Sequence, residues 1–232
     1  MKNILLIGGS YGIGLAIAEQ LQFENNVFIA SRSNENLADI EATYIQFDAS
    51  TDVLDTSKLP SVIDGLVYCP GSINLRPFKG IKPETFEADL QINFISLVKV
   101  IQSVLPNLLA AEQASIVTFS SVAASMGMPF HTSVSASKGA IEGFAKALAA
   151  EYAPKIRVNV IAPSLTDTPL ADKFLNNETK QEKSAERHPL KRFGKPEDSA
   201  QMATFLLSDK SSWISGQIFH VDGGMSTLLV NG

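Results

Sequence analysis

The chain opens with a short apolar run that stops at a cluster of glycines. In the expected strand at residues 3–7, every residue after Asn3 is Ile or Leu, and Gly8–Gly14 reads Gly-Gly-Ser-Tyr-Gly-Ile-Gly. From Ile13 to Phe23, apolar residues recur at helical spacing. A buried strand, a glycine-rich turn and a helix in this order predict the start of a βαβ unit.

The same alternation continues to the C-terminus. We expect further strands at residues 26–30, 43–47, 62–68, 115–119, 156–161 and 217–221, and further helices at 84–111, 134–152 and 196–207. Several strands are almost entirely apolar, which is typical of strands covered on both faces. The sequence therefore predicts an α/β fold, a doubly wound parallel sheet of Rossmann type, in one domain over residues 1–232.

The glycine cluster predicts a binding site for the pyrophosphate of a dinucleotide. Glycines permit a tight turn and a close approach of the backbone, and the helix that follows offers free N–H donors and a positive partial charge. The alternative is a tight connection without a ligand. We assign to this site Gly8, Ser10, Tyr11, Gly12, Ile13 and Gly14.

The end of the second strand predicts which dinucleotide binds. NAD sites usually have an acidic residue here for the ribose 2′-hydroxyl, whereas this chain has Ser31, Arg32 and Ser33. A guanidinium flanked by hydroxyls suits a 2′-phosphate and hence NADP. Otherwise Arg32 is simply exposed on a loop. Asp48, after the third strand, could accept a hydrogen bond from the adenine amino group or only cap a turn.

Composition excludes several other classes. The net charge is −5 with no basic run, which argues against a nucleic-acid partner. Cys69 is the only cysteine, so we expect no internal disulfide and a cytoplasmic location. The apolar N-terminal run is too short for a signal peptide, and no apolar stretch approaches the roughly 20 residues of a membrane helix. No metal site is expected.

One segment differs in composition from the rest. Residues 171–195 are polar and rich in charge, and they follow the sixth strand, at the end where ligands bind in this fold. We interpret residues 168–195 as a substrate lid. A solvated pair of surface helices is the alternative.

Further motifs carry a family resemblance. They are the sequences at 116–121, 135–138, 157–163, 194–198, 215–217 and 221–224, together with Gly8–Gly14 and Thr168. On these motifs the chain resembles the short-chain dehydrogenase/reductase family over essentially its whole length. The resemblance implies hydride transfer between a nicotinamide and a small-molecule carbonyl or alcohol. It also implies homo-oligomers, dimers or tetramers, formed through the helices at 84–111 and 134–152.

The resemblance also implies the roles of single residues. Ser121 would orient the substrate oxygen, Lys138 would hold the ribose, and Asn93 would support a proton relay. The resemblance also implies that the cofactor contacts Gly71, Pro163, Thr166, Thr168 and Lys138. Thr168 would lie beside the nicotinamide carboxamide. The family's catalytic tyrosine should stand four residues before Lys138, and that position is Val134.

Valine has no ionisable proton, so the acid/base step needs another group. Histidine is the residue type most often used as an acid or base near neutral pH, and His131 precedes the helix by a few residues. A water relayed by Ser121 is another candidate, whereas the hydroxyls of Ser133 and Ser135 are poor acids and Tyr11 sits over the phosphates. Milder departures from the family pattern are Ile7, Ser164 and the sequence Tyr-Cys-Pro-Gly at 68–71.

Three functions remain open. The first is an NADP-dependent oxidoreductase of the carbonyl reductase or secondary alcohol dehydrogenase type, impaired or served by another donor. The second is an inactive NADP(H)-binding sensor or partner protein, and the third is an elimination or isomerisation on the same fold. The substrate pocket would be lined by residues 126–130, 166–170 and parts of 171–195. Met126, Met128, Phe130 and Leu170 hint at an apolar substrate, although Met and Phe are more often core residues. The apolar tail at 225–232 could dock on a neighbouring subunit or fold back on its own.

Overall fold

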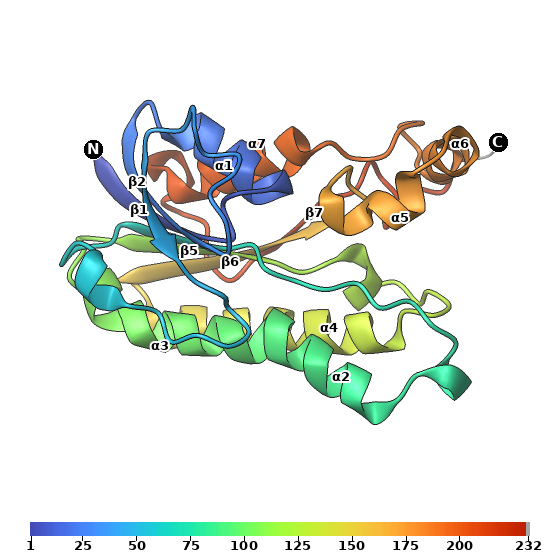
Figure 1. Ribbon diagram of the computed structural model, residues 1–232, viewed down its shortest axis with the longest axis horizontal. Coiled ribbons are helices and arrows are strands. Elements are labelled where there is room, and N and C mark those ends of the chain that lie inside the picture. The colour runs from blue at the N-terminus through green and yellow to red at the C-terminus, as the bar shows by residue number, and fades with distance from the viewer. Residues whose placement is uncertain (231–232) are drawn as a thin grey trace.

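The computed structural model describes residues 1–230, which form a single parallel sheet flanked by helices (Figure 1). The seven strands lie in the order β3-β2-β1-β4-β5-β6-β7, and every neighbouring pair is parallel. Their bounds are β1 Lys2–Ile7, β2 Asn25–Ser31, β3 Ala42–Gln46, β4 Gly65–Tyr68, β5 Ala114–Phe119, β6 Ile156–Pro163 and β7 Ile218–Val221. The predicted doubly wound fold is confirmed.

Helices cover both faces of the sheet, as Figure 1 shows. On one face lie α1 (Gly12–Leu21) and α7 (Pro196–Leu207). On the other lie α2 (Pro83–Leu90), α3 (Ser96–Leu109) and α4 (Thr132–Tyr152). The short helices α5 (Asp172–Leu175) and α6 (Glu178–Arg187) stand beyond the ends of the strands.

Strand β1 shows how the sequence builds a core on each face. Its side chains alternate, so Leu5 and Ile7 pack with α3 and α4 while Ile4 and Leu6 pack with α1 and α7. All four are buried. This explains why residues 4–7 of the strand are all apolar rather than alternating with polar residues.

The long helical pattern at residues 84–111 is not one regular α-helix, which corrects the prediction. A single wide π turn, Gln91–Ile95, separates α2 from α3. Asn93 lies in this turn, fully buried, and its side chain donates to the carbonyl of Asp89, 2.8 Å away. Such π bulges are frequent at functional sites, and hydrophobic periodicity alone does not reveal them.

The helical run Pro83–Leu109 also corrects the expectation about apolar stretches. It contains an 18-residue window with a mean hydropathy of 1.5, so by length and composition it could span a membrane. In the structure, Leu97, Val104 and Leu108 pack into the core against the sheet. The apolar face of this run is therefore occupied by the rest of the domain.

Candidate functional site

Two adjoining cavities open at the carboxyl ends of the strands, beside the point between β1 and β4 where the strand order reverses. Ligands bind at this switch point in open α/β sheets. The glycine cavity, about 760 Å³, lies between the glycine turn and the ends of β2 and β3. The α4 cavity, about 440 Å³, lies between the end of β5, the start of α4 and the α5–α6 segment. The residues that line both are Ile13, Cys69, Gly71, Thr168 and Leu170.

The glycine turn has a backbone conformation that would strain, or clash with, any residue that carries a Cβ. Gly8 and Gly12 have φ angles of +79° and +53°, in the region that favours glycine. A Cβ on Gly14 would lie 2.1 Å from the carbonyl oxygen of Gly8. The first turn of α1 can therefore approach β1 only with glycine at position 14, and the free N–H groups of the helix point to the cavity edge.

The end of β2 leaves a cation free in the glycine cavity. Arg32 is the only Lys or Arg that lines this cavity, and its guanidinium has no hydrogen-bond or ion-pair partner within residues 1–230. The flanking hydroxyls are already used, because Ser31 donates to the Ser33 carbonyl and Ser33 donates to the Tyr11 hydroxyl. The guanidinium, rather than the serines, is thus available to an anion.

Asp48 caps a turn in this structure. One carboxylate oxygen accepts from the backbone N–H of Ser50 at 2.8 Å, while the residue also lines the glycine cavity. The turn-capping alternative is therefore seen, and contact with an adenine stays a prediction. Together, the glycine turn, the N-terminus of α1 and the free guanidinium of Arg32 fit the phosphate groups of a dinucleotide. They would balance the negative charge of these phosphates.

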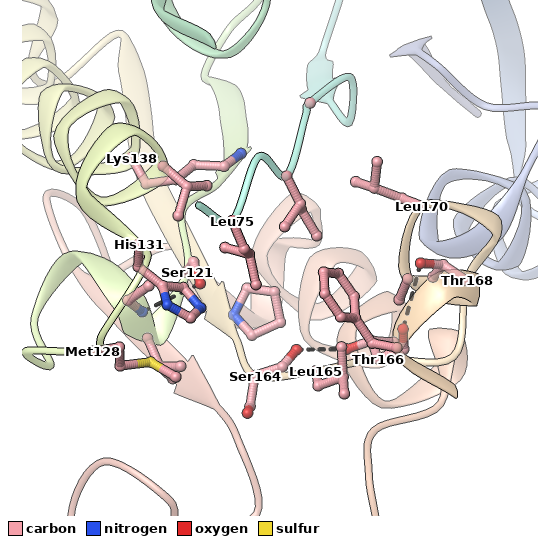
Figure 2. Close-up of a pocket in the computed structure, with 18 of the residues that line it drawn as sticks. Leu75, Ser121, Met128, His131, Lys138, Ser164, Leu165, Thr166, Thr168 and Leu170 are labelled. Carbon is pink, nitrogen blue, oxygen red and sulfur yellow. Dashed lines mark hydrogen bonds between the residues drawn. The ribbon is translucent and has the colours of Figure 1, made fainter. Parts of the chain in front are cut away.

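Three of the predicted catalytic positions meet at the α4 cavity. Ser121 follows β5, and Val134 and Lys138 are one turn apart on α4, so both face the same side of the helix. The Ser121 hydroxyl accepts from the Ala123 N–H at 3.2 Å, which leaves its own proton to donate. Figure 2 shows Ser121, His131 and Lys138 together on one side of the cavity and Thr168 and Leu170 on the other.

Lys138 is buried at the junction of the two cavities. Its ammonium donates to the carbonyl of Phe119 at 2.9 Å. Burial lowers its pKa to about 8, while the neighbouring Cys69 and Asp89 oppose this change. Burial also raises the pKa of the Cys69 thiol to about 12, so this cysteine is a neutral thiol beside the amine.

Asn93 belongs to a buried polar cluster that sequence reasoning missed. Its amide donates to Ser72 and to the Asp89 carbonyl. The Asp89 carboxylate, fully buried, accepts from Ser72, Asn74 and Ser133 at 2.5–2.7 Å. The three partners of the Asp89 carboxylate lie 15 to 44 residues away in sequence, so no local motif marks the cluster. Asn93 lines neither cavity, although a Cβ on Gly71 would lie 2.9 Å from its carbonyl oxygen and 3.3 Å from the Lys138 ammonium.

No tyrosine within residues 1–230 lines the α4 cavity. The Tyr68 hydroxyl donates to the Ile92 carbonyl, and burial raises its pKa well above the ordinary value. The Tyr11 hydroxyl donates to Glu35. Val134 itself is buried and lines the cavity wall.

His131 lines the same cavity as Ser121 and Val134. Its Nδ1 lies 2.7 Å from the Pro129 carbonyl, which can only accept, so Nδ1 carries a proton. In the neutral ring the free lone pair then belongs to Nε2, and protonation would turn that nitrogen into an acid. The preceding residue, Phe130, has a φ of 69°, which holds the loop in a strained shape before α4.

The α5–α6 segment forms one wall of the α4 cavity. Backbone hydrogen bonds join the two ends of this segment, which form its base. Thr166 pairs with Gly194, and Asp167 N–H and Gly194 N–H donate to the backbone across the base at 2.9 Å. At its other side the Lys173 ammonium donates to the Ile73 carbonyl at 2.9 Å. Its position over the cavity is observed, whereas the lid motion of residues 168–195 stays a prediction. Pro163, Thr166 and Thr168 line this cavity, and Thr168 also lines the glycine cavity.

Ser164, which departs from the family pattern, ties this wall to the sheet. Its hydroxyl donates to Nε2 of the buried His188 at 2.8 Å, and His188 Nδ1 donates to the Ser184 carbonyl at 2.7 Å. Met225 also contacts the Ser164 hydroxyl. The tail folds back as far as Leu228, which packs on Gly224, and Leu229 is exposed. Residues 231–232 of the predicted docking tail lie outside the described residues.

Comparison with known proteins decides the family. The family model described as "Enoyl-(Acyl carrier protein) reductase", of the short-chain dehydrogenase type, matches residues 8–226. The chain belongs to the short-chain dehydrogenase/reductase family. It is 33% identical to the 3-oxoacyl-[acyl-carrier-protein] reductase FabG of Thermotoga maritima, covering 97% of each chain.

Solved structures agree with this assignment. The ligand-free aldohexose dehydrogenase of Thermoplasma acidophilum is 27% identical with a TM-score of 0.90, covering 100% of this chain and 96% of that one. A tyrosine-to-phenylalanine variant of ElxO with NADPH bound is 25% identical with a TM-score of 0.89, covering 98% and 99%. This short-chain dehydrogenase/reductase is therefore an oxidoreductase of the NAD(P)-dependent class, acting on small molecules.

The buried Lys138 of this short-chain dehydrogenase/reductase predicts a pH-dependent stability. Its folded pKa, about 8, lies below the unfolded value, so above about pH 8 the unfolded state binds more protons. The contribution of Lys138 to the free energy of unfolding should therefore rise with pH from about 8 to its unfolded pKa, and be lowest and constant below this window.

Chemical denaturation of the native protein and of Lys138→Met at about pH 7 and about pH 9 checks this. The difference in free energy of unfolding between the two proteins should move in favour of the native one at the higher pH. The subtraction cancels Tyr68 and Cys69, whose raised pKa values act in the opposite direction in both proteins. An unchanged difference would contradict a lowered pKa.

Proposed function

We propose that this protein is an NADP-dependent carbonyl reductase or secondary alcohol dehydrogenase. The observation that carries the proposal is the meeting of the two cavities. A dinucleotide-sized cavity with a free guanidinium joins a second cavity at Gly71 and Thr168, and Ser121 and Lys138 line the second cavity beside that junction. A bound nicotinamide would supply or accept the hydride.

The protein's own residues would bind and orient. The glycine turn and the N-terminus of α1 hold the pyrophosphate, with Asp48 and Arg32 at the adenosine end. Lys138 holds the ribose, and Pro163, Thr166 and Thr168 support the nicotinamide end. Ser121 donates its free proton to the substrate oxygen, and Asn93 holds the loop at Ser72 close to Lys138.

The proton that accompanies the hydride needs a source other than Val134. His131 meets the first condition, because it lines the cavity and its Nδ1 is fixed by the Pro129 carbonyl. A water held by Ser121 is the alternative. The NADPH-bound phenylalanine variant of ElxO supports the view that a tyrosine hydroxyl can be absent while the dinucleotide is held.

The lid, the assembly and the location complete the proposal. Residues 168–195 would open and close on the substrate, with the Lys173 contact to Ile73 as the closing contact. Half-buried Phe94 and Phe144, in edge-to-face contact on the outer helices, would lie near a homo-oligomer interface. We expect no nucleic-acid or membrane partner and a cytoplasmic location.

Turnover of NADPH tests the proposal. We would follow NADPH oxidation over a panel of ketones and aldehydes and analyse the products by mass spectrometry. NADPH consumption with an alcohol product supports it. NADPH binding without consumption favours the inactive sensor or partner, for which the absence of a tyrosine at position 134 is the specific observation. A changed product without net consumption favours elimination or isomerisation.

Substitution of Arg32 should change cofactor preference. In Arg32→Ala, we expect NADPH to bind about tenfold more weakly while NADH is unaffected, since only the 2′-phosphate loses a charge-assisted hydrogen bond. Calorimetric titration of both cofactors measures this. Arg76→Ala removes an equally exposed guanidinium outside both cavities and should change neither affinity. Equal weakening of NADH and NADPH would argue that Arg32 does not read the 2′-phosphate.

A further inference from the structure

The α4 cavity is positively charged along the wall made by α5 and α6. This wall carries Lys173, Lys180, Lys183 and Arg187, and no Asp or Glu within residues 1–230 lines the cavity. The whole chain has a net charge of −5. The charge of the cavity is thus opposite to that of the protein, and a cleft of one sign concentrates ions of the other sign.

Helix α6 is turned so that its cations face the cavity. Lys180, Lys183 and Arg187 follow the i, i+3, i+7 spacing of one helix face, and all three line the cavity. The acidic residues of the same helix, spaced four apart, lie outside the lining at 178, 182 and 186. The rotation of the helix is held at its C-terminal end, where His188 bonds the Ser184 carbonyl of the helix and accepts from the Ser164 hydroxyl beyond β6.

Two of these cations are already bound within the protein and two are free. Lys173 donates to the Ile73 carbonyl, and Lys180 donates to the Lys173 carbonyl and to Asn176. Lys183 and Arg187 have no hydrogen-bond or ion-pair partner in the described part of the chain. Their donors are available to a ligand, although both side chains are exposed at the cavity mouth.

The free cations do not belong to the dinucleotide site. Neither Lys183 nor Arg187 lines the glycine cavity, where Arg32 is the only Lys or Arg among the lining residues 1–230. The lining of the α4 cavity also includes the apolar side chains Leu75, Met128 and Phe174. A ligand that fills the cavity would therefore meet the Ser121 hydroxyl, apolar side chains and two free cations.

We propose that Lys183 and Arg187 bind the anionic end of a small carbonyl substrate, a carboxylate or a phosphate, whose carbonyl lies at Ser121. This inference deepens the proposed function and rests on it. It also changes the hint of an apolar substrate, because the apolar side chains account for only part of the cavity lining. Guanidinium and ammonium groups make charge-assisted hydrogen bonds to such anions.

Binding of matched ketone pairs tests the inference without relying on turnover. The probes are levulinate with its methyl ester, and dihydroxyacetone phosphate with dihydroxyacetone, titrated calorimetrically into the complex with oxidised NADP, which has no hydride to transfer to them. In the double variant Lys183→Gln/Arg187→Gln, we expect the charged member of at least one pair to bind about tenfold more weakly and its neutral partner to bind unchanged. The pair that responds distinguishes a carboxylate from a phosphate. Raising the salt concentration should weaken only the charged member.

The matched control is Lys155→Gln/Lys210→Gln, which removes two exposed ammonium groups outside both cavities and should leave all four affinities unchanged. The inference is overturned if neither charged probe binds to the native protein, or if the charged and neutral probes weaken equally in the double variant. NADPH is titrated alone first. A chain that does not bind NADPH overturns the proposed function and this inference together, whereas intact NADPH binding with unselective ketone binding overturns this inference alone.

Discussion

Replacing Val134 by tyrosine should raise the rate of carbonyl reduction by about 10²–10⁴-fold, the usual contribution of general acid–base catalysis. The position lies one helical turn before Lys138, and its side chain lines a cavity of about 440 Å³ that can take a larger ring. The Lys138 ammonium would favour the phenolate and so lower the pKa of the new tyrosine from about 10 towards neutrality. Steady-state NADPH oxidation over the carbonyl panel measures the effect.

Val134→Phe is the matched control, because it adds the same ring without the hydroxyl. It should bind NADPH as Val134→Tyr does and gain no rate. If both variants gain rate equally, the ring acts by filling the cavity and not as an acid. If the native protein already turns over at ordinary rates, His131→Asn should lower that rate at least tenfold while leaving Val134→Tyr little changed. No loss in His131→Asn would leave the water held by Ser121 as the donor.

Replacing Gly14 by alanine should abolish NADPH binding and lower the free energy of unfolding by at least about 1–3 kcal/mol, as overpacking does. The added Cβ would lie 2.1 Å from the Gly8 carbonyl oxygen and 3.1 Å from the Gly9 Cα. These are backbone atoms of the turn, which cannot move aside as a flexible side chain would. The turn must therefore open, and the N-terminus of α1 must leave the position from which it would hold the pyrophosphate.

Gly143→Ala provides the control on the same type of substitution. Nothing lies within 4 Å of a Cβ at this position in the middle of α4. Alanine is a better helix former than glycine, so the free energy of unfolding of this variant should rise by about 0.5–1 kcal/mol. Its NADPH affinity should stay unchanged. Thermal unfolding with and without NADPH separates the two effects. Normal NADPH binding by a folded Gly14→Ala would show that the turn does not hold the dinucleotide.

Local sequence patterns were enough to predict the sheet and one edge of the site. Apolar periodicity located every strand to within three residues at each end, since a strand covered on both faces must be apolar throughout. Arg32 could be assigned to the site because it follows a strand, and the carboxyl ends of parallel strands meet at one edge. The role of Ser121 is what the family resemblance implies. The motif at 135–138 likewise placed Val134 and Lys138 on one helix face.

Other features depend on contacts between distant segments. Asp89 becomes buried and fully partnered only because Ser72, Asn74 and Ser133 meet it in space, up to 44 residues away. The π turn that turns Asn93 inward replaces a regular helix where hydrophobic periodicity continues without a break. Neither feature has a period or a spacing by which a single sequence would reveal it.

The sequence by itself determined the fold and the glycine turn, because strand periodicity and glycine spacing are local. The absence of the family's tyrosine at position 134 is what the family resemblance implies. Only the tertiary structure decided which charges face the α4 cavity. The composition of residues 171–195 shows mixed charge, and the direction of each side chain depends on how α6 is rotated against the sheet. Ser164 and His188, 24 residues apart, set that rotation through a hydrogen bond that forms only when the chain is folded.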